Sequence, residues 1–150
     1  LREGGQPGQP DPGRLVGAEA LIRWRHPEHG LLGPGAFLPA AGKYGLASSI
    51  DRWVISHAMA WLARESVENH SPPRISINLS AESIGNRDIL KFILQQLEIT
   101  GVAPQQLCFE ITETAVMASL TAATGFMLTL CGHGIRFCLD DVGSGLSSFT

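Results

Sequence analysis

A chain of 150 residues, 44% of them hydrophobic, is long enough to bury a core, and one domain is the first expectation. Its formal net charge of -3 excludes the basic surface that binds duplex nucleic acid or an anionic membrane. No apolar run is long enough to span a bilayer and no signal-peptide pattern is visible, so we expect a cytoplasmic chain. The three cysteines have no metal-ligand spacing, and we expect them to be small core residues in a reducing compartment.

The predicted elements alternate between strands and helices. Residues 1–14 are rich in Gly and Pro and lack a hydrophobic period, which predicts a flexible lead-in. Side-chain alternation predicts strands over residues 15–24, 74–80, 107–113 and 136–140. Apolar residues at three- and four-residue steps predict helices over residues 50–64, 88–99 and 116–131. This order indicates βαβ units and a parallel sheet with right-handed crossovers.

The helix predicted over residues 50–64 has the most regular pattern. Asp51 falls in its first turn, at the positive end of the helix dipole. Its apolar stripe consists of Ile50, Trp53, Val54, His57, Ala58, Trp61 and Leu62. On this stripe His57 is expected to be a packed core residue. None of the five histidines has a ligand spacing, so none is assigned to catalysis.

One face of each predicted strand is aliphatic, and the opposite face has a polar side chain: Glu19, Asn78, Glu110 and Asp140 in turn. A parallel sheet covered by helices on both faces would be hydrophobic throughout. A polar inner face is typical of a (β/α)8 barrel near its catalytic mouth. Such a barrel needs eight strands and about 250 residues. The sequence therefore predicts an α/β fold, a TIM-barrel-like half barrel with about four parallel strands.

The polar residues at the strand ends form a set of oxygen donors. Asp141 adds a second carboxylate beside Asp140, directly before a Gly-Ser-Gly turn. Oxygen-only donors favour Mg²⁺ or Mn²⁺, and two such ions can activate water against a phosphodiester. The pattern alone leaves open that these acids are rim residues paired with Arg or Lys. Arg23 shares the phase of Glu19 and can meet a ligand phosphate, or form a salt bridge to Glu19 or Asp140.

A set of motifs resembles one known family. The sequence Glu-Ala-Leu at residues 19–21, continued through residues 22–27, is similar to the signature of EAL domains, the cyclic-di-GMP phosphodiesterases. The resemblance continues in the family's order through residues 33–41, 51–54, 77–80, 109–114 and 139–145. It covers about residues 15–150, which we expect to form the N-terminal part of an EAL domain.

The resemblance implies a bacterial second-messenger enzyme that hydrolyses cyclic di-GMP to linear pGpG at a two-metal site containing Mg²⁺ or Mn²⁺. It implies Glu19, Asn78, Glu110, Asp140 and Asp141 as metal ligands, with Glu19, Asp140 and Asp141 as the catalytic residues. Leu21 and Arg23 match the residues that touch the dinucleotide.

The family's lysine and later carboxylates belong to strands beyond Thr150, so we expect the isolated chain to be inactive. Two unpaired strand edges should favour a dimer or other self-association. The chain is then cytoplasmic by itself or the cytoplasmic part of a larger, membrane-anchored signalling protein. A non-catalytic cyclic-di-GMP receptor is the alternative function, and it should bind nucleotide without metal.

Overall fold

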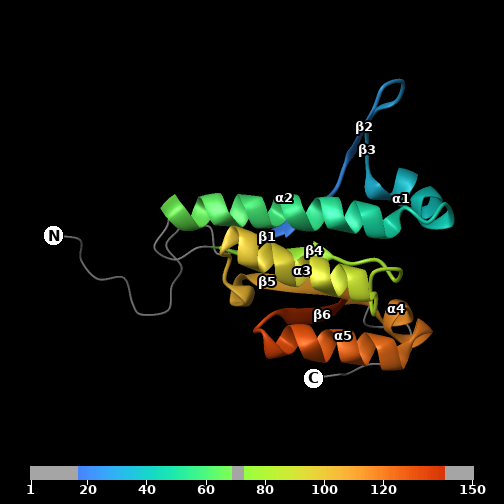
Figure 1. Ribbon diagram of the computed structural model, residues 1–150. Helices are drawn as coiled ribbons and strands as arrows, with labels where there is room; N and C mark the ends of the chain where they lie inside the picture. The colour runs from blue at the N-terminus through green and yellow to red at the C-terminus, as the bar shows by residue number, and fades with distance from the viewer. Residues whose placement is uncertain (1–16, 69–72, 141–150) are drawn as a thin grey trace, which may run out of the picture.

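The computed structural model describes residues 17–68 and 73–140 of the chain. Its main sheet is parallel with the order β1-β4-β5-β6, made of β1 (Gly17–Ala20), β4 (Arg74–Asn78), β5 (Leu107–Thr112) and β6 (Arg136–Asp140). A separate antiparallel hairpin, β2 (Trp24–His26) with β3 (Gly30–Leu32), projects from the body of the molecule (Figure 1). The helices are α1 (Pro34–Lys43), α2 (Ala47–Glu68), α3 (Arg87–Thr100), α4 (Glu113–Ala118) and α5 (Leu120–Gly132), with a 3-10 turn η1 (Pro104–Gln106).

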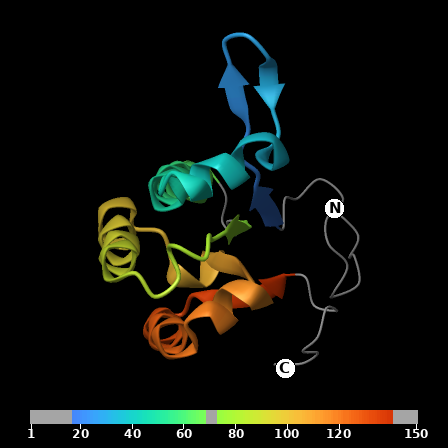
Figure 2. The same ribbon diagram turned by 90° about the vertical axis from the view of Figure 1, so that its right-hand side faces the viewer.

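The long helices cover one face of the sheet. Figure 2 shows α2, α3 and α5 side by side along that face. Their buried residues form one core with the inward residues of the strands, among them Ile77, Phe109 and Ile111, which are at most 1% exposed. Burying each such side chain contributes about 1.5–3 kcal/mol. The predicted alternation of strands and helices and the incomplete barrel are confirmed.

Local signals fix the ends of α3 close to the prediction. The side chain of Asn86 caps the helix by accepting hydrogen bonds from the backbone N–H groups of Asp88 and Ile89. Gly101 ends it in the left-handed conformation, at φ 68°, and its N–H bonds the carbonyl of Leu97.

The helix predicted over residues 116–131 is instead two helices. Ser119 breaks the run at φ -153° and ψ 75°, outside the helical region, so that α4 ends before it and α5 begins after it. Because both segments have apolar residues at helical spacing, periodicity alone did not reveal the break.

The predicted apolar stripe of α2 is partly confirmed: Ala58 and Leu62 are buried in the core, whereas Trp53 and His57 are not. The buried positions of this helix are Asp51, Ile55, Ala58, Met59 and Leu62. Trp53 and His57 are exposed and stack on each other with ring centroids 3.9 Å apart, so His57 is not a core residue. The three cysteines were predicted to be core residues. This is wrong for Cys131 and Cys138, which are exposed, and Cys108 is only partly buried.

The first predicted strand is shorter than the sequence pattern indicated. It ends at Ala20, residues 21–23 form no strand, and Trp24 begins the hairpin. Leu21 and Arg23 therefore lie outside β1, and strand alternation does not determine their orientation. The predicted lead-in at residues 1–14, Asp141 and the turn at residues 143–145 lie outside the described residues.

Candidate functional site

The polar residues predicted at the strand ends share one face of the sheet. Register partners in a parallel pair point to the same side, as do residues two apart in a strand. Glu19 pairs with Ser76, two residues before Asn78, and Asn78 pairs with Glu110. Asp140 lies two residues beyond Cys138, the partner of Glu110. The structure thus brings the residues of four strands to the face opposite the helices.

The acidic side chains of this face lie close enough to affect one another. The side-chain amide of Asn78 donates a hydrogen bond to Oε1 of Glu19 at 3.4 Å. Burial raises the pKa of the Glu110 carboxyl, and the charges of Glu19 and Asp140 raise it further, as does a side-chain hydrogen bond to Glu19. The charges of Glu19 and Asp140 therefore disfavour the ionised form of Glu110, and a cation would relieve that repulsion.

The donor set suits a hard divalent cation, since carboxylate and amide oxygens are the ligands that Mg²⁺ and Mn²⁺ accept. Within residues 17–68 and 73–140, however, no three His, Cys, Asp or Glu side chains already form a metal-binding group. The site is a cluster of oxygen donors on one face of the sheet. Binding a cation would require these side chains to turn toward a common centre.

Asp51 supports the loop that follows Asn78, a role that the sequence did not reveal. Asp51 lies in the second turn of α2, which begins at Ala47. Its carboxylate is only 7% exposed and accepts hydrogen bonds from Ser80 and Ser83. Ser80 donates its N–H at 3.0 Å and its hydroxyl at 2.6 Å, and Ser83 donates its hydroxyl at 2.5 Å. Burial raises the pKa of Asp51, and the three hydrogen bonds partly oppose that effect.

A cavity of about 630 Å³ joins this loop to the end of β1. Leu21, expected to contact a substrate, lines it together with Asn78, Ser80 and Asp51. Leu21 is 57% exposed, so a bound molecule would cover apolar surface that is now in water.

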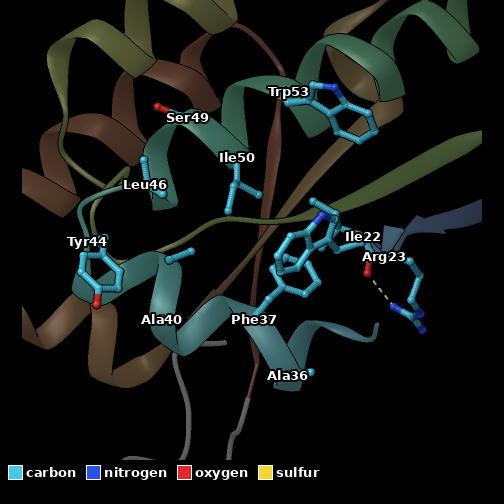
Figure 3. A pocket seen from close by; sticks show the side chains of 12 residues that line it. Ile22, Arg23, Ala36, Phe37, Ala40, Tyr44, Leu46, Ser49, Ile50 and Trp53 are labelled. Carbon is cyan, nitrogen blue, oxygen red and sulfur yellow. Dashed lines mark hydrogen bonds between the residues drawn. The ribbon is translucent and has the colours of Figure 1, made fainter. Parts of the chain in front are cut away.

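Arg23 lies beside a second, more apolar cavity of about 660 Å³, between the β1–β2 connection, α1 and the start of α2 (Figure 3). Its guanidinium bends back to donate a hydrogen bond to the carbonyl of Ile22 at 2.8 Å. Aromatic rings of Phe37, Tyr44 and Trp53 line the same cavity. Arg23 is exposed and lies in the β1–β2 connection, not in a strand as the sequence pattern predicted.

Glu113 is a further acidic residue that pattern reasoning assigned no role. It begins α4 directly after β5, where Thr112 caps the helix by accepting from the N–H of Ala115. Its Oε1 is buried and has no hydrogen-bond partner among the residues that the structure describes. A buried carboxylate oxygen without a partner raises the free energy of the folded state. Glu113 follows the carboxyl end of β5, the strand that also presents Glu110.

The family model of the EAL domain matches residues 6–150 of the chain. The chain belongs to the EAL domain family. It is 35% identical over 136 residues to the bifunctional diguanylate cyclase/cyclic di-GMP phosphodiesterase MucR of Pseudomonas aeruginosa, covering 91% of this chain and 20% of that protein. It is 39% identical over 137 residues to the biofilm architecture maintenance protein MbaA of Vibrio cholerae, covering 91% of this chain and 17% of the relative.

The fold of this EAL domain agrees with a solved relative. The phosphodiesterase of MucR in complex with c-di-GMP superposes with a TM-score of 0.83 at 34% identity, covering 91% of this chain and 55% of the solved chain. The chain therefore spans about half of the solved domain and about a fifth of the curated relatives named above. Within its described residues, no helix combines the length and apolar character needed to cross a membrane.

Proposed function

We propose that this chain is the metal- and nucleotide-binding half of an EAL domain that hydrolyses cyclic di-GMP to linear pGpG. The observation that supports the proposal most directly is the face on which Glu19, Asn78, Glu110 and Asp140 gather from four neighbouring strands. Membership of the EAL family and the c-di-GMP complex of the MucR phosphodiesterase indicate the substrate.

Each residue of the face has a role in the proposal. Glu19, Asn78, Glu110 and Asp140 would hold Mg²⁺ or Mn²⁺, with Asp141 as the carboxylate of a second ion. When bound, these ions supply Lewis-acid activation of water and neutralise charge on the phosphodiester. The carboxylate of Glu19 also orients the amide of Asn78, and Glu19 and Glu110 contribute to the negative field of the cluster.

Substrate contacts would come from the loop after β1. Leu21 presents apolar surface to the cavity that it shares with Asn78, suited to one face of a guanine base. Arg23 has its guanidinium at an exposed position and can leave the carbonyl of Ile22 for a phosphate, which accepts its N–H donors bidentately. Hydrolysis adds the elements of water across one phosphodiester bond and opens the cyclic dinucleotide.

The isolated chain should bind without turning over. It spans about half of the solved domain, and we expect the general-base and remaining ligand groups to come from the other half. Calorimetry of the chain with Mn²⁺, and then with cyclic di-GMP in the presence of Mn²⁺, tests binding. Chromatography of the nucleotide after incubation tests hydrolysis. Mn²⁺-dependent binding without pGpG formation is the expected result.

Variants separate the metal site from the nucleotide site. Glu110→Gln and Asn78→Ala should weaken Mn²⁺ binding at least tenfold, whereas Arg23→Ala should leave it unchanged and weaken nucleotide binding. Equal nucleotide binding with and without chelator would instead support a metal-independent receptor. Failure to bind Mn²⁺ and nucleotide under every condition would overturn both functions for this chain.

A further inference from the structure

Two cysteines face each other across neighbouring strands of the sheet. Cys108 lies on β5 and Cys138 on β6, and their sulfur atoms are 3.2 Å apart. Cys138 is the register partner of Glu110, two residues beyond Cys108, so both thiols lie on the polar face of the sheet. Neither cysteine is in a disulfide. Cys108 pairs in register with Arg136, so the two cysteines are offset by two residues along neighbouring strands. Their sulfur atoms must close from 3.2 Å to the S–S bond length of about 2.05 Å to form a disulfide.

The two thiols differ in access to solvent. Cys138 is exposed, whereas Cys108 is partly buried. The third cysteine, Cys131, is exposed on α5, which packs against the opposite face of the sheet (Figure 2). The sheet thus lies between Cys131 and the pair, and in the isolated chain Cys138 is the more accessible thiol of the pair.

We propose that Cys108 and Cys138 form an oxidative modification site at which a peroxide closes a disulfide between β5 and β6. The Cys138 thiol takes one oxygen from the peroxide and becomes a sulfenic acid, which releases one water molecule. The sulfur of Cys108 then attacks the Cys138 sulfur. The S–S bond forms as the S–O bond breaks, and the hydroxyl leaves with the thiol proton as a second water molecule. The two cysteines lose two electrons, and one peroxide gains them.

The disulfide would join the two strands that present Glu110 and Asp140. Each acid is two residues from one cysteine of the pair and on the same face of the sheet. A small-molecule thiol would reverse the link by exchange. The modification does not depend on the proposed hydrolysis, because it uses only the sulfur atoms and an external oxidant.

Peptide mapping of the whole chain tests the proposal. The reduced protein is treated with equimolar hydrogen peroxide, the remaining thiols are alkylated, and the digest is analysed by mass spectrometry. We expect two of the three cysteines to escape alkylation, a linked Cys108–Cys138 peptide pair, and full recovery of alkylation after dithiothreitol. At one fixed peroxide concentration, the share of links formed within single chains should not depend on protein concentration, because the step that forms the S–S bond is within one chain.

Single variants provide the controls. Cys131→Ala should retain the link at the wild-type rate, whereas Cys108→Ala and Cys138→Ala should lose it. If either of the latter variants does not fold, its Ser substitution replaces it, and the wild-type map alone still decides. Three alkylatable thiols after peroxide treatment, links that include Cys131, or links that form only between chains would each overturn the proposal.

Discussion

The side-chain amide of Asn78 donates to the carboxylate of Glu19 across 3.4 Å, although the two residues lie 59 positions apart in the chain. The contact exists because β1 and β4 are neighbours in the parallel sheet, with Glu19 in register with Ser76. It joins the signature motif of the EAL family to the next oxygen donor along the sheet. The order of the strands in the sheet therefore brings the site residues together, and substituting its charged residues tests its chemistry.

Glu110 should make the stability of the protein depend on pH. Burial and the charges of Glu19 and Asp140 raise its pKa above the ordinary value of 4.5, so the folded state binds its proton more tightly than the unfolded chain. Its contribution to stability is then fully present below the unfolded pKa and is lost as pH rises through the folded pKa. Without a divalent cation, Glu110→Gln should be more stable than wild type at pH 7, by less than about 1 kcal/mol because solvent screens the site.

Urea unfolding at pH 4 and pH 7 measures this difference. The gain should be larger at pH 7 than at pH 4, and Mn²⁺ should abolish it by stabilising wild type alone. Glu98→Gln provides a control, since Glu98 is an exposed residue of α3 away from the strand ends. A wild-type protein that is more stable than Glu110→Gln at pH 7 without cation would contradict the predicted repulsion.

Strand patterns predicted the site face well because the strand period is two. The alternation of side chains along each strand was enough to place Glu19, Asn78, Glu110 and Asp140 on one face. The helix phase of α2 was harder, because apolar residues occur on nearly all sides of it and two stripes compete. The role of Asp51 could not be predicted, because its partners Ser80 and Ser83 lie 29 and 32 residues away. Such pairings depend on tertiary packing.

The buried face of α2 can be tested by two substitutions. Met59 is 0% exposed and lies in the core, so Met59→Ala should lower the free energy of unfolding by about 2–5 kcal/mol. Trp53 is 54% exposed, and Trp53→Ala removes mainly its stack on His57, about 1 kcal/mol. Urea midpoints with unchanged slopes provide the comparison. Equal losses of stability in the two variants would contradict this burial pattern and favour the predicted stripe that includes Trp53.

The carboxylate of Asp51 should hold the loop after Asn78 in place. In Asp51→Ala, the N–H and hydroxyl of Ser80 and the fully buried hydroxyl of Ser83 lose their acceptor. We expect a loss of about 3 kcal/mol, since hydrogen bonds to a charged group are strong and buried donors are left unpaired. Asp88→Ala, in the exposed first turn of α3, should cost less than about 1 kcal/mol. Similar losses for both would show that the three hydrogen bonds do not stabilise the fold.

Gly85, between this loop and α3, is required for two independent reasons. Its φ is 81°, and a Cβ there would lie 2.8 Å from the Cβ of Ala122 and 3.1 Å from its backbone carbon. Gly45 has a similar φ of 69° with nothing within 4 Å, and helical Gly125 also has open space. Gly45→Ala should thus cost about 1 kcal/mol for backbone strain alone. Gly85→Ala should cost more than about 2 kcal/mol because the contact with α5 adds to that strain.

Gly125→Ala completes the series, because alanine in a helix with free space should stabilise the protein by up to about 1 kcal/mol. The unfolding temperatures of the three variants, measured at one pH, give the order of their stabilities. Gly125→Ala should unfold above wild type, Gly45→Ala somewhat below it, and Gly85→Ala lowest. If Gly85→Ala and Gly45→Ala unfolded together, the close approach of α5 to this loop would not contribute. The loop that follows Asn78 would then be held to α2 by Asp51 and by the hydrogen bond from Ser48 to Glu82.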